Sequence, residues 1–180
     1  VVNTQRGLCA ARLLTNGSVD SSFAGPNVIA PGRVGIEIGN NEANAYAAAL
    51  QADGKLLIAG RAVTGASKSD FALVRLNQDG SPDAALEGPA GGAAGVMTLT
   101  MGLYYDYGLA MAVQADGRIV LVGQCSLADL NFCIARLLPD GSLDPSFDGP
   151  SGYGNGRVNL SLSTSGTQGD WANAVAIQAD

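Results

Sequence analysis

The sequence predicts an all-β protein made of tandem copies of one small antiparallel sheet. The first observation behind this prediction is internal repetition, because the chain aligns with itself at a period of about 62 residues. The second is that each period holds four short apolar segments separated by Gly-containing turns. The third is composition: 47% of the 180 residues are hydrophobic and only 14% are charged, which is enough to bury a core.

The first strand of each repeat is expected in an alanine-rich segment. Residues 44–50, 107–113 and 171–177 align without a gap. Alanine on its own favours helix, but Ala45 and Ala47 belong to a small face that alternates with other residues, which is the two-residue period of a strand. Such a face suits the strand nearest the axis of a radial arrangement. A glutamine follows each segment, at Gln51, Gln114 and Gln178.

The other three strands of each repeat follow in a fixed order. The second is expected at residues 55–60 and 118–123, directly after Asp-Gly turns in which glycine supplies a positive φ. The third carries a recurring arginine, at Arg12, Arg75 and Arg136. The fourth surrounds a recurring valine, at Val34, Val96 and Val158. Four antiparallel strands per period, repeated in tandem, are typical of β-propeller blades.

Together these segments form a motif that resembles a known family. The pattern A-x-A-x-x-x-Q-x-D-G-[KR]-[IL]-x-x-x-G, followed by [DN]-F-x-x-x-R-L-x-x-D-G-S-x-D, is similar to the delta-60 repeat, a bacterial propeller-type repeat of large secreted or surface proteins. The resemblance covers nearly the whole chain, in two full and two partial copies. It implies propeller blades and carries no common catalytic site. The departures from the pattern are Asn16, Pro82 and Leu86, each of which affects a single turn.

The phase of the repeat predicts the division of the chain into blades. Residues 1–43 should form a partial blade with the third and fourth strands, 44–106 and 107–170 two full blades, and 171–180 the first strand of the next. The cycle lacks the equivalents of residues 54–63, the second strand, and closed propellers use roughly 4 to 8 blades. We therefore expect a segment of a larger propeller, whose neighbours are further blades of a longer chain or a second copy.

The three cysteines suggest one disulfide. Cys125 and Cys133 lie eight residues apart across the expected hairpin of residues 126–130, where facing strand positions bring Cβ atoms close enough to bond. Cys9 has the repeat position of Cys133, and its partner would fall before residue 1. The alternative is three buried thiols in a cytosolic protein. A disulfide fits an oxidising compartment, so we expect a secreted, extracellular or cell-surface protein.

Repeated polar residues allow structural and functional interpretations. Each recurring arginine stands eight residues before an aspartate, at Asp20, Asp83 or Asp144, which suggests a structural ion pair in each blade or else a functional ring of charges. The Asp-Gly-Ser turns make Asp79, Asp83, Asp140 and Asp144 weak calcium candidates, although Asp-Gly-Ser is also ordinary turn chemistry. The recurring glutamines could cap the adjacent turns or line an axial channel that binds a polar ligand.

The links that vary between repeats are the candidate binding surface. In a four-stranded antiparallel blade, the links between the second and third strands and those between successive blades emerge on one face. We expect them at residues 63–69, 126–130, 39–43, 102–106 and 163–170. Their aromatic and acidic residues suit sugar rings or protein partners, and the candidates are Tyr104, Tyr105, Asp106, Asp170 and Trp171. Alternatively, Tyr107 and Trp171 pack between blades.

Composition narrows the function further. The absence of histidine removes His-based triads and metal sites built on histidine, and a net charge of −6 with scattered Lys and Arg does not favour nucleic acid. No apolar run is long enough for a membrane span. We expect a non-enzymatic binding or scaffold module for a glycan or protein, with no catalytic residue and no cofactor. The alternatives are a polysaccharide-cleaving enzyme that uses Asp106 and Asp170, and a structural element that self-associates through its open strands.

Overall fold

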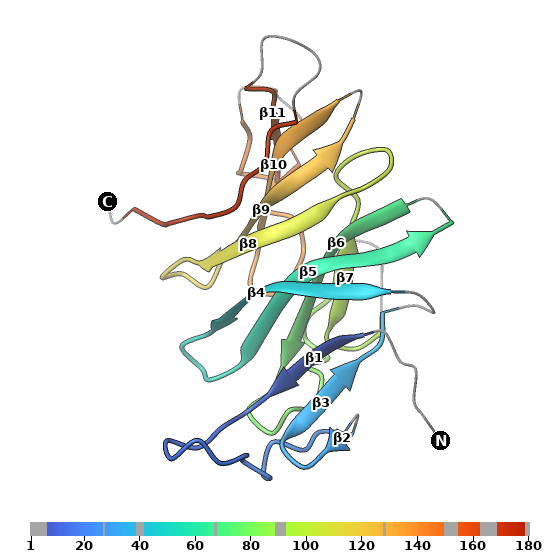
Figure 1. Cartoon of the computed structure of the whole chain (residues 1–180). Coiled ribbons are helices and arrows are strands. Elements are labelled where there is room, and N and C mark those ends of the chain that lie inside the picture. The colour runs from blue at the N-terminus through green and yellow to red at the C-terminus, as the bar shows by residue number, and fades with distance from the viewer. Residues whose placement is uncertain are drawn as a thin grey trace.

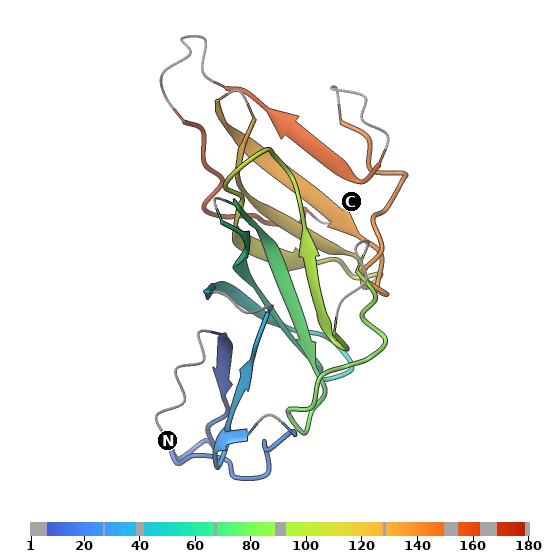
Figure 2. The same ribbon diagram turned by 90° about the vertical axis from the view of Figure 1, so that its right-hand side faces the viewer.

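The protein is built entirely from strands and their connections in the part that the structure describes. The computed structural model describes residues 7–26, 28–38, 42–66, 68–88, 93–127, 129–149, 155–162 and 169–178. These residues form eleven strands in three antiparallel sheets and no helix. The sheets follow one another along the molecule in sequence order (Figures 1 and 2). The prediction of an all-β fold is therefore confirmed.

Each of the two full repeats forms one four-stranded sheet. The middle sheet has the order β4-β5-β6-β7 and consists of β4 (Ala43–Leu50), β5 (Leu56–Gly65), β6 (Lys68–Leu76) and β7 (Val96–Leu99). The third sheet has the order β11-β10-β9-β8 and consists of β8 (Tyr107–Val113), β9 (Ile119–Ser126), β10 (Leu130–Leu137) and β11 (Arg157–Leu160). Sequential strands are neighbours throughout, as in a propeller blade.

The first sheet contains the two expected strands and one that the sequence analysis missed. Its order is β1-β3-β2, with β1 (Leu8–Ala11) and β3 (Arg33–Ile36) as the third and fourth strands of a repeat. The additional strand, β2 (Val28–Ala30), pairs with β3 across a turn in which Gly32 has a φ of 68°. A strand of three residues is too short to produce a periodic pattern, which explains why it was not predicted.

Residues 171–178 lie on the third sheet but do not form the strand expected over 171–180. Ala172 and Val175 pack against Val120 and Val122 on the outer face of this sheet. One backbone hydrogen bond joins this segment to the sheet, from Ala172 N to Gly123 O at 3.3 Å. A strand requires a continuous ladder of backbone hydrogen bonds to a neighbouring strand. Among the described residues, this segment instead packs its side chains on the face of the third sheet. Residues 179–180 lie outside the described residues.

Packing between neighbouring sheets buries both faces of the middle sheet. Leu57 and Leu73 join Leu121 of the third sheet in one hydrophobic cluster. Ile58 and Val74, which directly follow them in sequence, join a second cluster with the first sheet. This alternation is the two-residue period of a strand with both faces covered. The first strand of the third sheet also packs against the middle sheet, because β8 contacts β4, β5 and β6.

The predicted disulfide joins Cys125 of β9 to Cys133 of β10. Both cysteines are fully buried and their Cα atoms are 5.8 Å apart. Their register differs from the expected one, because Cys125 lies opposite Asn131 and Cys133 lies opposite Gly123. The bridge is therefore diagonal, across positions two residues apart in the ladder. Cys9 on β1 is a free, exposed thiol.

A β-bulge interrupts the first strand at the same place in both full repeats. The pairing of β4 with β5 shifts between Ala45 and Ala47, and that of β8 with β9 shifts between Gly108 and Ala110. The uninterrupted alternation expected for this strand is therefore wrong, since a bulge inserts one unpaired residue. The bulge brings backbones together: a Cβ added at Gly60 would lie 1.8 Å from Asn44 O. A Cβ at Gly123 would lie 1.8 Å from Tyr107 O.

This close approach predicts the effect of adding a methyl group to β5. Gly60→Ala should lower the free energy of unfolding by about 2 kcal/mol, because the methyl group displaces backbone in a packed sheet. Gly65→Ala is the matched control at the last residue of β5, where the nearest atom to an added Cβ, Lys68 Cβ, is 3.7 Å away. Urea unfolding followed by circular dichroism measures both. Equal effects of the two substitutions would contradict the bulge geometry.

Candidate functional site

The variable links of successive repeats meet on one face, as predicted. The link of residues 102–106 lies against the β5–β6 hairpin, because Ser69 N donates to Tyr104 O at 2.9 Å and Asp106 N donates to Ser69 O at 2.8 Å. The same link reaches the next hairpin, since Leu103 N donates to Ser126 O at 2.5 Å. It therefore joins the hairpins of two neighbouring blades. We call the surface formed by this link and the two hairpins that it contacts the loop face. Residues 39–41 and 163–168 of the other predicted links lie outside the described residues.

Asp106 is not part of the exposed surface on which we expected it. Its side chain is fully buried, and its Oδ2 accepts hydrogen bonds from Met101 N at 2.7 Å and Gly102 N at 2.8 Å. Its Oδ1 accepts one from Ser126 N at 3.3 Å. Burial raises the pKa of Asp106, although these backbone donors oppose that shift. The carboxylate therefore fixes the loop from within, because it accepts hydrogen bonds from the backbone amides of Met101 and Gly102 at the start of the link.

Asp170 has a related role one repeat later. Its Oδ2 accepts a hydrogen bond from Leu162 N at 2.7 Å, and its backbone N donates to Leu130 O at 3.0 Å. The residue thus anchors its own link to the β9–β10 hairpin. Both carboxylates that the enzymatic hypothesis assigned to catalysis are bonded to backbone amides. The sequence alone could not distinguish such an anchor from a binding residue, because both stand beside aromatic residues in a loop.

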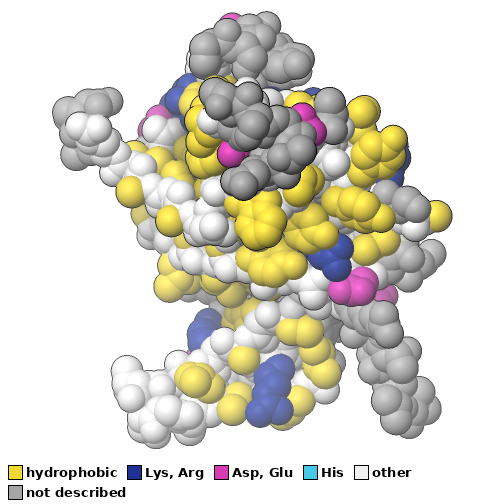
Figure 3. Space-filling model, turned by 45° about the horizontal axis from the view of Figure 1, so that its top comes forward, with side chains coloured by type: hydrophobic (Ala, Val, Ile, Leu, Met, Phe, Trp, Pro, Cys, Tyr) yellow, Lys and Arg dark blue, Asp and Glu magenta, His cyan; other side chains and the backbone are white. Residues whose placement is uncertain are grey.

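The aromatic candidates are exposed. Tyr104 is 54% exposed, Tyr105 45% and Trp171 58%. Tyr107 differs: the guanidinium of Arg61, in the preceding sheet, lies 5.1 Å from its ring centroid. The alternative of packing between blades therefore holds for Tyr107, whereas Trp171 is exposed among the described residues. Figure 3 shows hydrophobic side chains gathered in groups on the side of the molecule that it displays.

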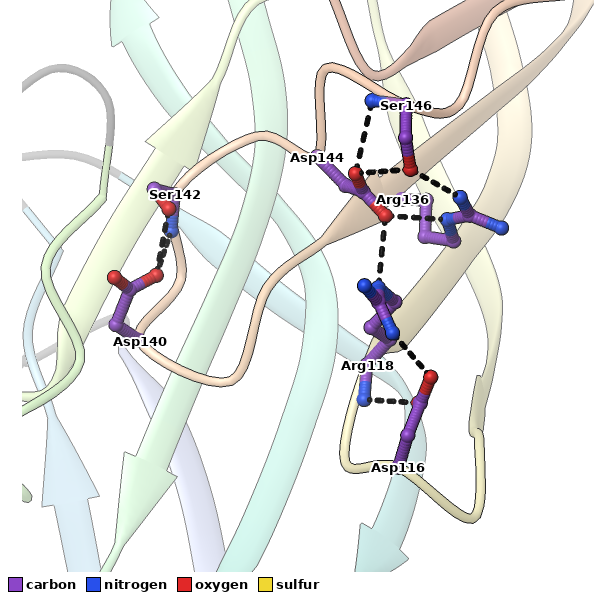
Figure 4. Close-up of polar contacts among 7 residues, drawn as sticks. All are labelled: Asp116, Arg118, Arg136, Asp140, Ser142, Asp144 and Ser146. Carbon is purple, nitrogen blue, oxygen red and sulfur yellow. Dashed lines mark hydrogen bonds and ion pairs between the residues drawn. The ribbon is translucent and has the colours of Figure 1, made fainter.

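The recurring arginine and aspartate pair in every repeat. In the third sheet, Asp144 Oδ2 accepts from Arg136 Nε at 2.8 Å and from Arg118 Nε at 2.9 Å (Figure 4). Its Oδ1 accepts hydrogen bonds from Ser146 N at 2.9 Å and from Ser146 Oγ at 2.7 Å. The hydrogen bonds from Ser146 and the charge of Arg136 lower the pKa of Asp144 to about 2. The carboxylate thereby joins the second strand, the third strand and the turn that follows.

The other two repeats contain the same pair. Arg75 Nε lies 2.6 Å from Asp83 Oδ2, and Lys55 supplies the second cation at 3.0 Å. Arg12 Nε lies 2.8 Å from Asp20 Oδ2. Repetition at equivalent positions, with little exposure of Arg75 and Asp83, indicates a structural ion pair rather than a ring of charges that faces a ligand.

Two of the three recurring arginines, Arg12 and Arg75, also reach the next repeat, which the sequence analysis did not predict. Arg12 Nη1 donates to the carbonyl of Gln78 at 2.5 Å, and Arg75 Nη1 donates to the equivalent carbonyl of Pro139. Two backbone hydrogen bonds run in the same direction. They are Ala24 N to Asp79 O at 2.8 Å and Glu87 N to Asp140 O at 2.6 Å. The turn that follows the third strand of one blade is thus hydrogen-bonded to the equivalent turn of the next blade.

An apolar side chain completes this contact between repeats. Phe23 and Leu86 occupy equivalent positions and are each only 3% exposed. A Cβ at Gly80 would lie 3.2 Å from the Phe23 ring, and one at Gly141 would lie 2.8 Å from Leu86 Cδ1. The glycine therefore provides both a positive φ and room for the side chain of the preceding repeat. We call this set of interactions the inter-repeat contact.

The calcium candidates have other partners. Asp79 and Asp140 accept hydrogen bonds from the backbone and hydroxyl of Ser81 and Ser142, which lowers the pKa of both carboxyls. Asp83 and Asp144 are paired with cations, as described above. Across the described ranges, no group of three or more acidic or cysteine side chains is arranged to hold a metal ion. Asn16 makes the same turn contacts to Ser18, so this departure from the repeat motif preserves the turn.

The recurring glutamines contribute to their turns through the backbone. Gln51 N donates to Lys55 O at 2.9 Å and Gly54 N donates to Gln51 O at 2.9 Å, and Gln114 is equivalent. The side-chain Oε1 atoms of Gln51 and Gln114 are buried without a hydrogen-bond partner among the described residues. The predicted side-chain cap is therefore not observed at these two positions. Gln178 is exposed.

Comparison with known families identifies the repeat. The sequence matches the family described as "Domain of unknown function (DUF5122) beta-propeller" over residues 1–23, 51–85 and 114–147, which together exceed half of the chain. The chain belongs to this family. The DUF5122 match contains the Asp-Gly turns and the Arg-Asp pairs, whereas the link of residues 102–106 lies outside it. A search of curated proteins finds no match to the chain. The described residues include no helix that could cross a membrane.

The lowered pKa of Asp144 predicts a pH-dependent contribution to stability. The contribution is present above the ordinary pKa of 3.8 and is lost as the pH falls from about 4 to about 2, because the folded state must then protonate a bonded carboxylate. Asp144→Asn should therefore lower the thermal midpoint at neutral pH, and the difference from wild type should shrink over this interval. Asp129→Asn is the control, since no hydrogen bond joins its carboxylate to a described residue. A difference that stays constant with pH would contradict the assignment.

Proposed function

We propose that this DUF5122 chain is a non-enzymatic binding or scaffold module, part of a propeller with repeats of the delta-60 type, in a secreted or surface-exposed protein. Its loop face would present aromatic side chains to a glycan or a protein partner. The observation that carries this proposal is the construction of the link of residues 102–106. It is bonded to two hairpins and anchored by a buried carboxylate, yet it exposes Leu103, Tyr104 and Tyr105.

A fixed loop with exposed aromatic residues favours binding. A side chain held on an ordered backbone loses little further conformational freedom when a ligand binds, so more of the contact energy appears as affinity. Tyrosine offers an apolar ring for the face of a sugar or for a protein side chain, together with a hydroxyl that forms hydrogen bonds. These properties support Tyr104 and Tyr105 as contact residues, with Trp171 as the exposed aromatic of the following repeat.

Two further features support the non-enzymatic role and the compartment. Asp106 and Asp170 bond to backbone amides that hold their links in place, a role that suits an anchor better than an acid or base. The Cys125–Cys133 disulfide suits an oxidising environment outside the cytosol.

Substitution of the loop-face tyrosines tests this function. The protein is screened on a glycan array and, in parallel, in a pull-down from surface extracts, and each ligand found is titrated against Tyr104→Ala and Tyr105→Ala. We expect at least one of them to weaken binding about tenfold or more, because an aromatic hot-spot residue contributes about 2 kcal/mol or more and a tenfold change corresponds to about 1.4 kcal/mol. Tyr46→Ala is the matched control, since Tyr46 is 46% exposed but lies on β4.

The outcomes separate the hypotheses. Weakened binding in Tyr104→Ala, in Tyr105→Ala or in both, with unchanged binding in Tyr46→Ala, supports the loop face as the site. Ligands that bind all three variants equally, or a protein that retains no ligand in either screen, would contradict it.

A further inference from the structure

The inter-repeat contact has two different halves. The donor half is the recurring arginine of one repeat together with the Phe or Leu in the turn that follows its third strand, as in Arg75 and Leu86. The acceptor half is the Asp-Gly turn of the next repeat, with its carbonyls and its glycine, as in Gly141. The chain makes this contact twice in the same direction, from the first sheet to the middle sheet and from the middle sheet to the third. A contact of this kind is heterologous, so each unit can in principle use both halves at once.

The third sheet carries a donor half that no turn covers in the described part of the chain. Phe147 is partly exposed, whereas its equivalents Phe23 and Leu86 are buried. The guanidinium of Arg136 lies 4.6 Å from the centroid of the Phe147 ring, so the two groups form a single surface. Arg136 donates through Nε to Asp144 and through Nη2 to Ser146. Its Nη1 is equivalent to the atom that reaches the next repeat in the other two arginines, and it donates to no described residue.

The first sheet carries an acceptor half that is equally open. Its turn is formed by Asn16 and Gly17, with the same hydrogen bonds to Ser18 that the Asp-Gly-Ser turns make. Gly17 has the required left-handed conformation, with a φ of 83°. A Cβ placed at Gly17 would meet nothing within 4 Å, whereas the equivalent glycines of the other two repeats are covered. The exposed side chain of Leu14 lies in the same turn.

We propose that the donor half of the third sheet, Arg136 and Phe147, docks onto the Asn16-Gly17 turn of a second copy of this chain. The partner is a second copy because one chain displays both halves in the geometry that it uses twice internally. The arginine would donate to the carbonyl of Thr15, the position equivalent to Gln78 and Pro139. The phenyl ring would cover Gly17, as Phe23 covers Gly80.

This association deepens the scaffold part of the proposed function and is independent of ligand binding by the loop face. In an antiparallel blade, the turn after the third strand lies at the opposite end of the strands from the loop face. Copies joined in this way would display their loop faces side by side. Head-to-tail contacts close into a ring or extend into a chain, depending on the rotation between copies.

Two substitutions on opposite halves test the proposal. Gly17→Asn keeps the turn, because asparagine tolerates the left-handed conformation, but places a side chain where the phenyl ring would pack. Phe147→Ser removes the ring. By sedimentation velocity over a concentration series, we expect wild type to associate increasingly with concentration and each variant to remain monomeric. An equimolar mixture of the two variants should form only a one-to-one dimer, because it retains one intact pair of halves.

Controls separate this contact from other causes. Gly117→Asn makes the same change in a turn with a φ of 86°, where the nearest atom to an added Cβ, Pro139 Cγ, lies 3.4 Å away, and it should associate like wild type. Circular dichroism verifies that each variant is folded. Wild type that stays monomeric at every concentration overturns the proposal, as do single variants that associate like wild type or a mixture that forms larger species. A monomer that still binds its ligand through Tyr104 and Tyr105 would leave the proposed function intact.

Discussion

The structure depends on an arginine that is shared between two repeats. Arg75 pairs through Nε with Asp83 of its own blade and donates through Nη1 to the carbonyl of Pro139 in the next. The first of these bonds fixes the turn after the third strand, and the second fixes that turn against its neighbour. A blade with two apolar faces cannot bury both of them alone, so it is stable only when such contacts hold a neighbour on each side. Gly80 and Gly141, in the turns after the third strands, are required because the apolar side chain of the preceding repeat packs on each of them.

This constraint divides each blade into a structural end and a variable end. The structural end contains the Asp-Gly turns and the ion pairs, all of which lie within the residues that match the DUF5122 family. The variable end contains the links between blades, which can differ because the opposite end already sets the spacing of the sheets. Asp106 illustrates how a variable link still becomes ordered, since its buried carboxylate accepts hydrogen bonds from the backbone amides of Met101 and Gly102. Exposed aromatic residues can then occupy a fixed position without weakening the fold.

Much of the fold could be predicted because repetition identifies equivalent positions without knowledge of their environment. The strand order, the pairing of Arg136 with Asp144 and the Cys125–Cys133 disulfide all follow from spacing. The bulge opposite Gly60 could not be predicted, because its cause is a backbone approach that leaves only a glycine in the sequence. Burial of Asp106 was missed because sequence does not reveal which loop carboxylates face inward. The reach of arginine to the next blade was missed because its acceptor is a backbone carbonyl, which every residue has.

The most direct test of this account is amide hydrogen exchange of the native protein at Glu87, followed by NMR. Glu87 lies outside any strand, and its amide is bonded only if the turn of the third sheet is docked, at 2.6 Å from the carbonyl of Asp140. Amides in undocked loops exchange with little protection, whereas amides bonded across a packed contact exchange only when that contact opens. The account predicts that Glu87 is protected to the same degree as the amides of β6, and that Ala24, its equivalent in the first sheet, is protected as well. Exchange of Glu87 at the rate of an exposed loop would contradict it.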